Sequence, residues 1–230
     1  MKNISLVKVG GVCAILVAVS LIAMSVSGAW IESFEDAEQS LLAKADNPMP
    51  YVTQRWFYFL SFVLAMPAAL GFYQILREAG ALLWIAVVAV VAGGFIAMVD
   101  SLIILGVWYQ LAPDYAEASA ATRPALLVMD RTLMQIAGLG HLVEWALAAG
   151  IGVGLFAVAI LQTAVLPKWI GWLGLTVVAL VGGWLHLLTP VSDALGVIHD
   201  IKLSSFTLWM LVMGVALLRL REPVKTATGV

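Results

Sequence analysis

Cysteine is almost absent from this sequence of 230 residues: the one cysteine, Cys13, lies inside an apolar run near the N-terminus. A single thiol cannot form a disulfide within the chain, and there is no Cys-x-x-Cys motif for redox chemistry. Charge is also scarce, because only 11% of the residues are Asp, Glu, Lys or Arg. Typical soluble domains contain roughly 25%. The chain therefore lies outside the soluble class, and it has no basic surface with which to bind nucleic acid.

Histidine is nearly as rare, with three residues in the whole chain. The sequence contains no His-Glu-x-x-His motif and no clustered histidine boxes of the kind that di-iron membrane oxygenases need. It also lacks Gly-x-Ser-x-Gly and a phosphate-binding loop. These absences exclude zincin-type proteases, hydrolases with a nucleophile elbow and P-loop nucleotide hydrolases.

Apolar residues make up 63% of the chain, and the mean hydropathy is +1.02. Six apolar segments are each long enough to cross a hydrocarbon layer, which is about 30 Å thick. The predicted fold is all-α: a polytopic membrane protein whose six transmembrane helices form a single domain, residues 1–230, surrounded by the lipid bilayer. We expect the spans at residues 7–30, 53–76, 81–105, 138–162, 169–188 and 197–218.

Basic residues gather at one end of the predicted spans, and most acidic residues lie in the loops at the other end. The basic residues at this end are Lys2, Lys8, Arg77, Lys168, Arg219, Arg221 and Lys225. Because Lys and Arg flank the cytoplasmic ends of membrane helices, we expect both termini in the cytoplasm. The third and fourth apolar segments are longer than one crossing, so we expect both to project on the outer side, capped by the loop from Asp114 to Arg123.

The fourth span carries a strip of small and polar residues: Gly138, His141, Glu144, Ala148 and Gly152. Residues three and four apart share one face of a helix. Ionisable groups at membrane depth are costly and normally face protein or water, so we expect this strip to point into the bundle. Glu144 should have a partner there, and the sequence offers Lys202 or His141.

Other polar residues fall at a similar depth when about twenty residues, one crossing, are counted from each cytoplasmic anchor. We therefore predict an outward-opening cavity with Asp100 at its rim and with Trp184 and Trp209 among its apolar walls. Its predicted ligand-binding residues are Asp100, His141, Glu144, Trp145, His186, His199 and Lys202. Two plainer interpretations stay open: polar helix ends meeting lipid headgroups, and an ion pair between helices without a ligand.

A metal or haem is a further alternative. Three histidines could serve one metal ion together with a carboxylate, or two of them could ligate a haem axially. The metal ligands would be His141, His186, His199 and Glu144, which lie on separate helices without a diagnostic spacing. Two classes of function follow. The first, which we favour, is a non-enzymatic protein that binds a lipid or small amphiphile or is a subunit of a membrane complex; the second is a metal- or haem-dependent enzyme acting at the periplasmic face.

The junction of the fourth and fifth spans has a distinctive pattern. Ala157-Val-Ala-Ile-Leu-Gln162 leads to Leu166-Pro167-Lys168-Trp-Ile-Gly171-Trp-Leu-Gly174. Over residues 132–190 the chain resembles a bacterial family of six-helix integral membrane proteins described only as a domain of unknown function. That family commonly has Leu-Pro-Arg where this chain has lysine. The resemblance implies a bacterial inner-membrane protein, and it carries over no catalytic residue.

Overall fold

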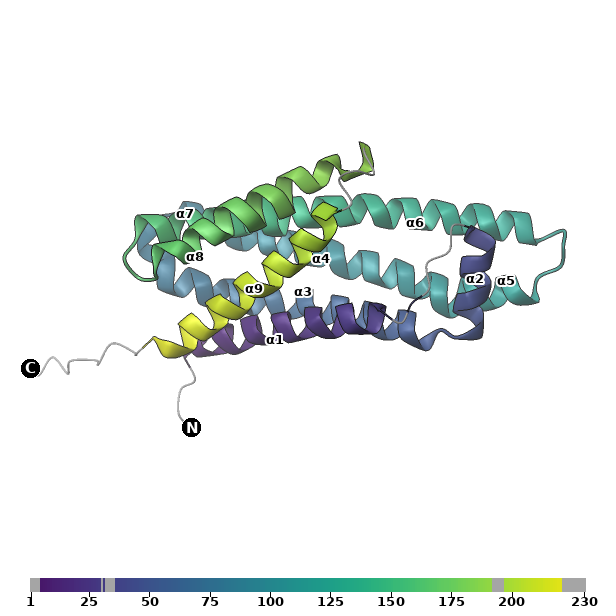
Figure 1. Ribbon diagram of the computed structural model, residues 1–230, viewed down its shortest axis with the longest axis horizontal. Coiled ribbons are helices and arrows are strands. Elements are labelled where there is room, and N and C mark those ends of the chain that lie inside the picture. The colour runs from purple at the N-terminus through teal and green to yellow at the C-terminus, as the bar shows by residue number, and fades with distance from the viewer. Residues whose placement is uncertain (1–4, 30, 32–35, 192–196, 221–230) are drawn as a thin grey trace, which may run out of the picture.

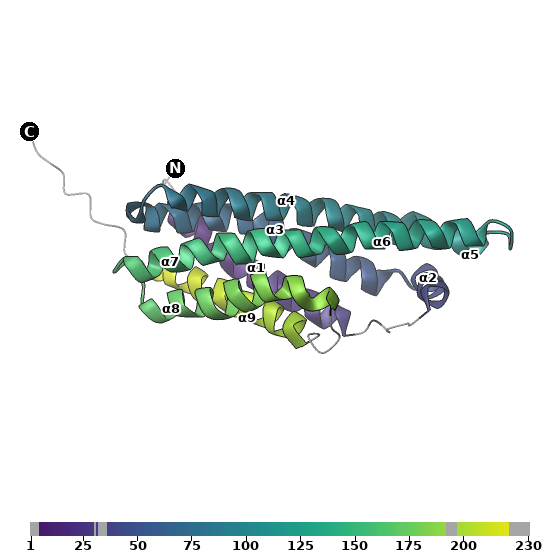
Figure 2. The same cartoon turned by 90° about the horizontal axis from the view of Figure 1, so that it is seen from above.

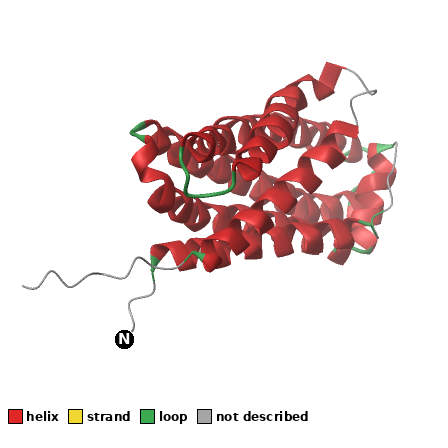
Figure 3. Cartoon of the chain, turned by 60° about the vertical axis from the view of Figure 1, so that its left-hand side comes forward, coloured by secondary structure: helices red, strands yellow, loops and turns green. Residues whose placement is uncertain are grey.

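The computed structural model describes residues 5–29, 31, 36–191 and 197–220 (Figure 1). Helices and short loops make up this described part, and no strand occurs in it (Figure 3). In chain order the helices are α1 (Leu6–Gly28), α2 (Ala37–Asp46), α3 (Met49–Leu76), η1 (Arg77–Ala79), α4 (Leu82–Gly106), η2 (Val107–Leu111), α5 (Ala112–Glu117), α6 (Arg123–Trp145), η3 (Ala146–Val153), α7 (Gly154–Gln162), α8 (Lys168–Leu173), η4 (Gly174–Trp184), η5 (Leu185–Val191) and α9 (Val197–Arg219).

Six helical stretches in the described residues are long and apolar enough to cross a membrane. The prediction of an all-α fold with six membrane-competent helices is therefore confirmed. α1 begins and α9 ends at one end of the elongated bundle, and α2 and α5 lie at the other (Figure 1). The six stretches are Leu6–Gly28, Met49–Ala79, Leu82–Glu117, Arg123–Gln162, Lys168–Leu188 and Ile201–Arg219.

Two of these stretches are longer than one crossing. Leu82–Glu117 has 36 residues and Arg123–Gln162 has 40, whereas about 20 residues cross a hydrocarbon core. They lie side by side and meet in a turn at residues 118–122, beyond α5 (Figure 2). Their length supports the prediction that both project from the bilayer.

Buried apolar residues form two clusters. The larger one, which includes Phe62, Phe72 and Trp145, fills the middle of the bundle and the end where α1 begins. The smaller one, which includes Leu41 and Trp108, lies where α2 covers the long helices. Two separate cores leave a junction between them, and the polar residues of the bundle gather at this junction.

Glycines bring the helices around this junction into close contact. A Cβ on Gly93 of α4 would lie 2.7 Å from the carbonyl oxygen of Glu144, and one on Gly183 of η4 would lie 2.3 Å from Cα of Gly150. Membrane helices commonly pack through such small residues, which let backbones approach. These two contacts seat the end of α6 against α4, and η4 against η3.

The predicted strip on the fourth span needs one correction. Gly138 is exposed, and a Cβ there would meet nothing within 4 Å. Ala137, four residues before His141, is buried in its place. Positions 137 and 138 are both one turn before His141, and the structure turns Ala137 inward and Gly138 outward.

We predict that Gly93→Ala destabilises the protein, because the added methyl group collides with backbone atoms of α6. Overpacking of this kind typically costs about 1–3 kcal/mol, and the thermal unfolding midpoint of the purified protein would measure it. Gly138→Ala is the matched control on the partner helix. With open space around it and the better helix propensity of alanine, it should leave the midpoint unchanged or raise it slightly. Equal midpoints for the two variants would contradict this account of the α4–α6 contact.

Candidate functional site

Glu144 is the most deeply buried carboxylate of the described residues, with 0% exposure in the last turn of α6. The periodicity of α6 explains its position, since the apolar residues Leu139 and Val143 are 66% and 47% exposed on the outer face. Immediately after Trp145 the helix widens into the π-helical segment η3, a type of distortion that is frequent at functional sites.

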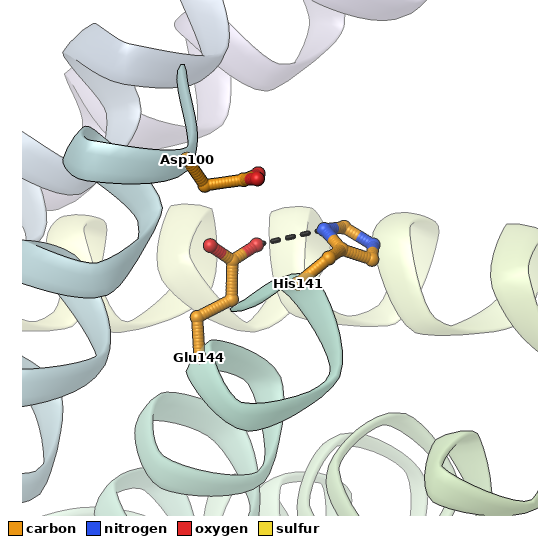
Figure 4. Close-up of side chains that lie close together, drawn as sticks. All are labelled: Asp100, His141 and Glu144. Carbon is orange, nitrogen blue, oxygen red and sulfur yellow. Dashed lines mark ion pairs between the residues drawn. The ribbon is translucent and has the colours of Figure 1, made fainter. Parts of the chain in front are cut away.

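Two groups donate hydrogen bonds to Glu144. The hydroxyl of Tyr58, on α3, donates to Glu144 Oε1, and Nδ1 of His141 lies 2.8 Å from the same oxygen. Figure 4 shows the imidazole and the carboxylate facing each other one turn apart on the helix. The indole nitrogen of Trp145 in turn donates to the Tyr58 hydroxyl at 2.9 Å. Trp145, Tyr58, His141 and Glu144 are thus joined in one hydrogen-bonded network.

Lys202, on α9, is 1% exposed and is held by two imidazoles. Its ammonium lies 3.0 Å from Nε2 of His141 and 3.0 Å from Nε2 of His186. It also lies 4.5 Å from the centre of the Trp145 ring, where a cation is attracted to the aromatic face. An ammonium has three donors and no acceptor, so both ring nitrogens act as acceptors.

This arrangement decides the tautomer of His141. Since Nε2 accepts from Lys202, a neutral His141 carries its proton on Nδ1, and that proton points at Glu144. The result is a continuous hydrogen-bonded chain from Lys202 through His141 to Glu144. The sequence had offered Lys202 or His141 as the partner of Glu144, and the structure connects the carboxylate to both.

A second pair of charges lies beside Lys202 and Glu144. Arg55 of α3 pairs with Asp100 of α4, which is 3% exposed, and the guanidinium lies 4.7 Å from the centre of the Tyr58 ring. The expectation that Asp100 lies at a cavity rim is therefore wrong, because Arg55 holds the carboxylate inside the bundle. The two cations and two carboxylates balance, as buried charges must to avoid a large desolvation cost.

A cavity of about 210 Å³ adjoins both pairs. His141 is 24% exposed and keeps this network in contact with the surroundings. The lining residues come from α1, α3, α4, η2, α6 and α9: Met24, Gln54, Arg55, Tyr58, Ile104, Trp108, His141, Trp145, Lys202 and Leu203.

Of the three tryptophans expected in its walls, Trp145 is the one found there. Trp184 packs over Gly150 instead, and Trp209 donates to the carbonyl oxygen of Ile170 at 3.2 Å. Seven residues separate Trp209 from Lys202, about 10 Å along a helix, so it lies too deep to reach the cavity.

Four buried polar atoms that have no hydrogen-bond partner among the described residues belong either to residues that line the cavity or to the carboxylates paired with those residues. Two are donors: Nε of Arg55 and the indole nitrogen of Trp108. Two are acceptors: Oδ1 of Asp100 and Oε2 of Glu144. Native structures rarely leave such groups unsatisfied, which makes this part of the bundle a candidate binding site.

Residues 9–220 match a family model described as Domain of unknown function (DUF4386). The chain belongs to this family. The match extends well beyond residues 132–190, on which the resemblance of the sequence rested. No curated protein and no solved structure matches the chain. The function of this DUF4386 protein is therefore argued from its own site.

Asp100, His141 and Glu144 place one possible ligand atom each within 4.8 Å of one another, which is close enough for a metal ion (Figure 4). The neighbouring cations oppose this use. A metal on Nδ1 of His141 would force the ring proton onto Nε2, against the Lys202 ammonium 3.0 Å away, whereas a metal-bound histidine needs an acceptor there. Lys202 likewise stands between His141 and His186, where a shared metal or a haem iron would have to lie. We therefore assign no metal centre to this network.

Six of the predicted site residues thus come together: Asp100, His141, Glu144, Trp145, His186 and Lys202. The side chain of His199, the seventh, lies outside the described residues. Sequence reasoning missed Arg55, Tyr58 and Trp108. The sequence did contain a signal for Arg55 and Tyr58: they lie three residues apart in the first turns of an apolar helix, where an arginine is unusual.

We predict that Glu144→Ala is strongly destabilising, because it leaves Lys202 as an uncompensated buried charge. Breaking a buried pair in this way costs about 3–5 kcal/mol, measurable as a lowered thermal unfolding midpoint. The double variant Glu144→Gln with Lys202→Met removes both charges and should recover most of the loss. A midpoint for the double variant as low as for Glu144→Ala would show that the two residues are not energetically coupled.

Proposed function

We propose that this protein binds the polar headgroup of an amphiphile in the cavity between α1, α3, α4, α6 and α9. The observation that carries this proposal is the pair of buried donors without partners, Nε of Arg55 and the indole nitrogen of Trp108, both on residues that line the cavity. Each unsatisfied donor costs about 1–3 kcal/mol. A headgroup with several acceptor oxygens satisfies both donors and removes this cost.

The size of the cavity narrows the class of ligand. At about 210 Å³ it is smaller than the roughly 300–1,000 Å³ of sites that enclose a drug-sized molecule. It therefore fits a headgroup and not a whole lipid. Met24, Ile104 and Leu203 supply apolar lining, along which the first part of a hydrocarbon chain passes toward the membrane. A phosphate is the acceptor-rich group that membrane amphiphiles most commonly carry.

The basic residues also bear on the membrane in which the protein lies and on its orientation. We infer a bacterial inner-membrane protein with both termini in the cytoplasm, as the basic residues at the ends of the predicted spans support. The polar cavity then lies in the outer half of the bundle. Ligands enter it from the periplasm or from the outer leaflet.

Cysteine labelling tests this orientation. With Cys13 replaced by serine, single cysteines at Ser119 and Thr226 should behave oppositely toward a membrane-impermeant thiol reagent in intact spheroplasts. Position 119 should react, and position 226 should react only after lysis. Labelling of position 226 in intact cells would overturn the assignment of the termini.

We predict saturable binding of dodecyl phosphate, at one site per chain, to the protein in maltoside micelles. Trp108→Phe keeps the aromatic ring but removes the donor, so it should weaken binding about 5–10-fold, the effect of one hydrogen bond of about 1–1.4 kcal/mol. Isothermal titration calorimetry measures both constants.

Trp184→Phe is the matched control, because it is the same chemical change at a tryptophan outside the cavity wall. Its affinity should equal that of the unchanged protein. Absence of saturable binding, or an equal loss in the two variants, would contradict the proposed ligand site.

A further inference from the structure

Lys202, His141 and Glu144 form a hydrogen-bonded chain whose two ends carry opposite charges. The Lys202 ammonium donates to His141 Nε2 at 3.0 Å, and His141 Nδ1 faces Glu144 Oε1 at 2.8 Å. An imidazole that accepts on one nitrogen and donates on the other can pass a proton between its two neighbours. Lys202 also lines the cavity. A change in the charge of Lys202 therefore changes the charge of the cavity wall.

We propose that these three residues form a proton relay that converts Lys202 into a neutral amine facing the cavity. One N–H bond of the Lys202 ammonium breaks, and its proton binds Nε2 of His141. The Nδ1–H bond of His141 breaks, and that proton binds Oε1 of Glu144. The products are a neutral amine, a neutral imidazole in its other tautomer and a carboxylic acid. No proton enters or leaves the protein.

The two forms have the same hydrogen bonds with their direction reversed. In the neutral form Glu144 donates to His141 Nδ1, and His141 Nε2–H donates to the amine nitrogen. His186 still accepts from one of the two remaining amine hydrogens. Transfer therefore leaves none of these partners unsatisfied. It removes two buried charges and their desolvation cost, and it gives up their mutual attraction. These two effects have opposite signs, so the loss of the attraction is offset by the relief of the desolvation cost.

The residues around Lys202, His141 and Glu144 hold these three side chains in place, so the proton has one path between them. From α3, Tyr58 donates to Glu144 and Arg55 lies over the Tyr58 ring; from α4, Asp100 neutralises Arg55. From η5, His186 holds the far side of the Lys202 ammonium at 3.0 Å. The charges of Arg55 and Asp100 already cancel each other. The proton that moves along the relay is therefore the one exchanged between Lys202 and Glu144.

A neutral lysine amine is a nucleophile, whereas an ammonium is not. In the cavity it can attack an acyl carbon once its lone pair leaves the N–H of His141 Nε2. A bond from nitrogen to carbon forms, the bond from carbon to the leaving group breaks, and the proton that the nitrogen loses goes to the leaving group, while Glu144 keeps the proton that the relay delivered. The relay goes beyond headgroup binding and does not depend on it. Acyl compounds with a leaving group are thus the class of reactant that this site takes.

The test measures how acetylation of Lys202 depends on pH. The purified protein in micelles is treated with 4-nitrophenyl acetate at pH 6, 7 and 8, and acetylation of each lysine is followed by mass spectrometry. Because the proton stays inside the protein, the Lys202 rate constant should change less than about twofold over this range. The exposed Lys168 is an internal standard, whose rate should rise about tenfold per pH unit, as for any amine that must release its proton to water.

Two variants separate the relay from a simple ion pair. In Glu144→Gln the proton has no internal acceptor, so the Lys202 rate should become pH-dependent and rise up to about tenfold per unit. His141→Gln removes the middle member of the relay, so it should also make the Lys202 rate pH-dependent. It serves as the test variant if Glu144→Gln does not fold. His186→Gln removes a hydrogen-bond partner of Lys202 that lies outside the relay, and the pH-independence should persist.

Three results would overturn the relay. One is a Lys202 rate in the unchanged protein that rises with pH as steeply as that of Lys168. The second is a Lys202 that is never acetylated while Lys168 is. The third is a flat profile in both the unchanged protein and Glu144→Gln, which would mean that the amine is neutral without Glu144. None of these results depends on dodecyl phosphate binding, so the relay and the headgroup site are tested separately.

Discussion

A carboxylate without exposed surface in an apolar helix bundle must have its charge compensated, and this need organises the protein around Glu144. Compensation comes through an intermediary, because His141 lies between Glu144 and the Lys202 ammonium. The partners stand on separate helices, so satisfying one charge requires α3, α6 and α9 to meet at one depth. Breaking the network would leave a buried ion, which is far more costly than losing a surface contact. The hydrogen-bonded chain from Lys202 through His141 to Glu144 therefore helps to hold these helices together.

The site lies where two apolar cores meet. Tyr58 and Trp145 belong to the larger cluster, whereas Ile104 and Trp108 belong to the cluster beneath α2, and all four line the cavity. The glycine contacts at Gly93 and Gly183 bring backbones close together next to this junction, so the helices that carry the site are tightly packed.

The same residues serve two separable purposes. Paired charges, Arg55 with Asp100 and Lys202 with Glu144 through His141, satisfy each other and balance to zero. The donors Nε of Arg55 and the indole nitrogen of Trp108 have no partner among the described residues, and the proposed headgroup site rests on them. The Lys202 ammonium lies between two imidazoles and takes the position that a metal shared by His141 and His186 would need.

The sequence by itself determined the all-α class, the six membrane-competent segments and the burial of Glu144, because helical periodicity and the cost of a charge in lipid act locally along the chain. Counting residues from the ends of the spans also selected Lys202, His141 and His186, since depth follows from the constant rise of a helix. Only the tertiary structure decided which faces meet. Ala137 rather than Gly138 faces inward on α6. α3 contributes Tyr58, which donates to Glu144, and Arg55, which pairs with the buried Asp100. Trp209 is the exception, because its distance from Lys202 along α9 already places it too deep for the cavity. Depth follows from the sequence of a single helix, whereas contact depends on how two helices are turned toward each other.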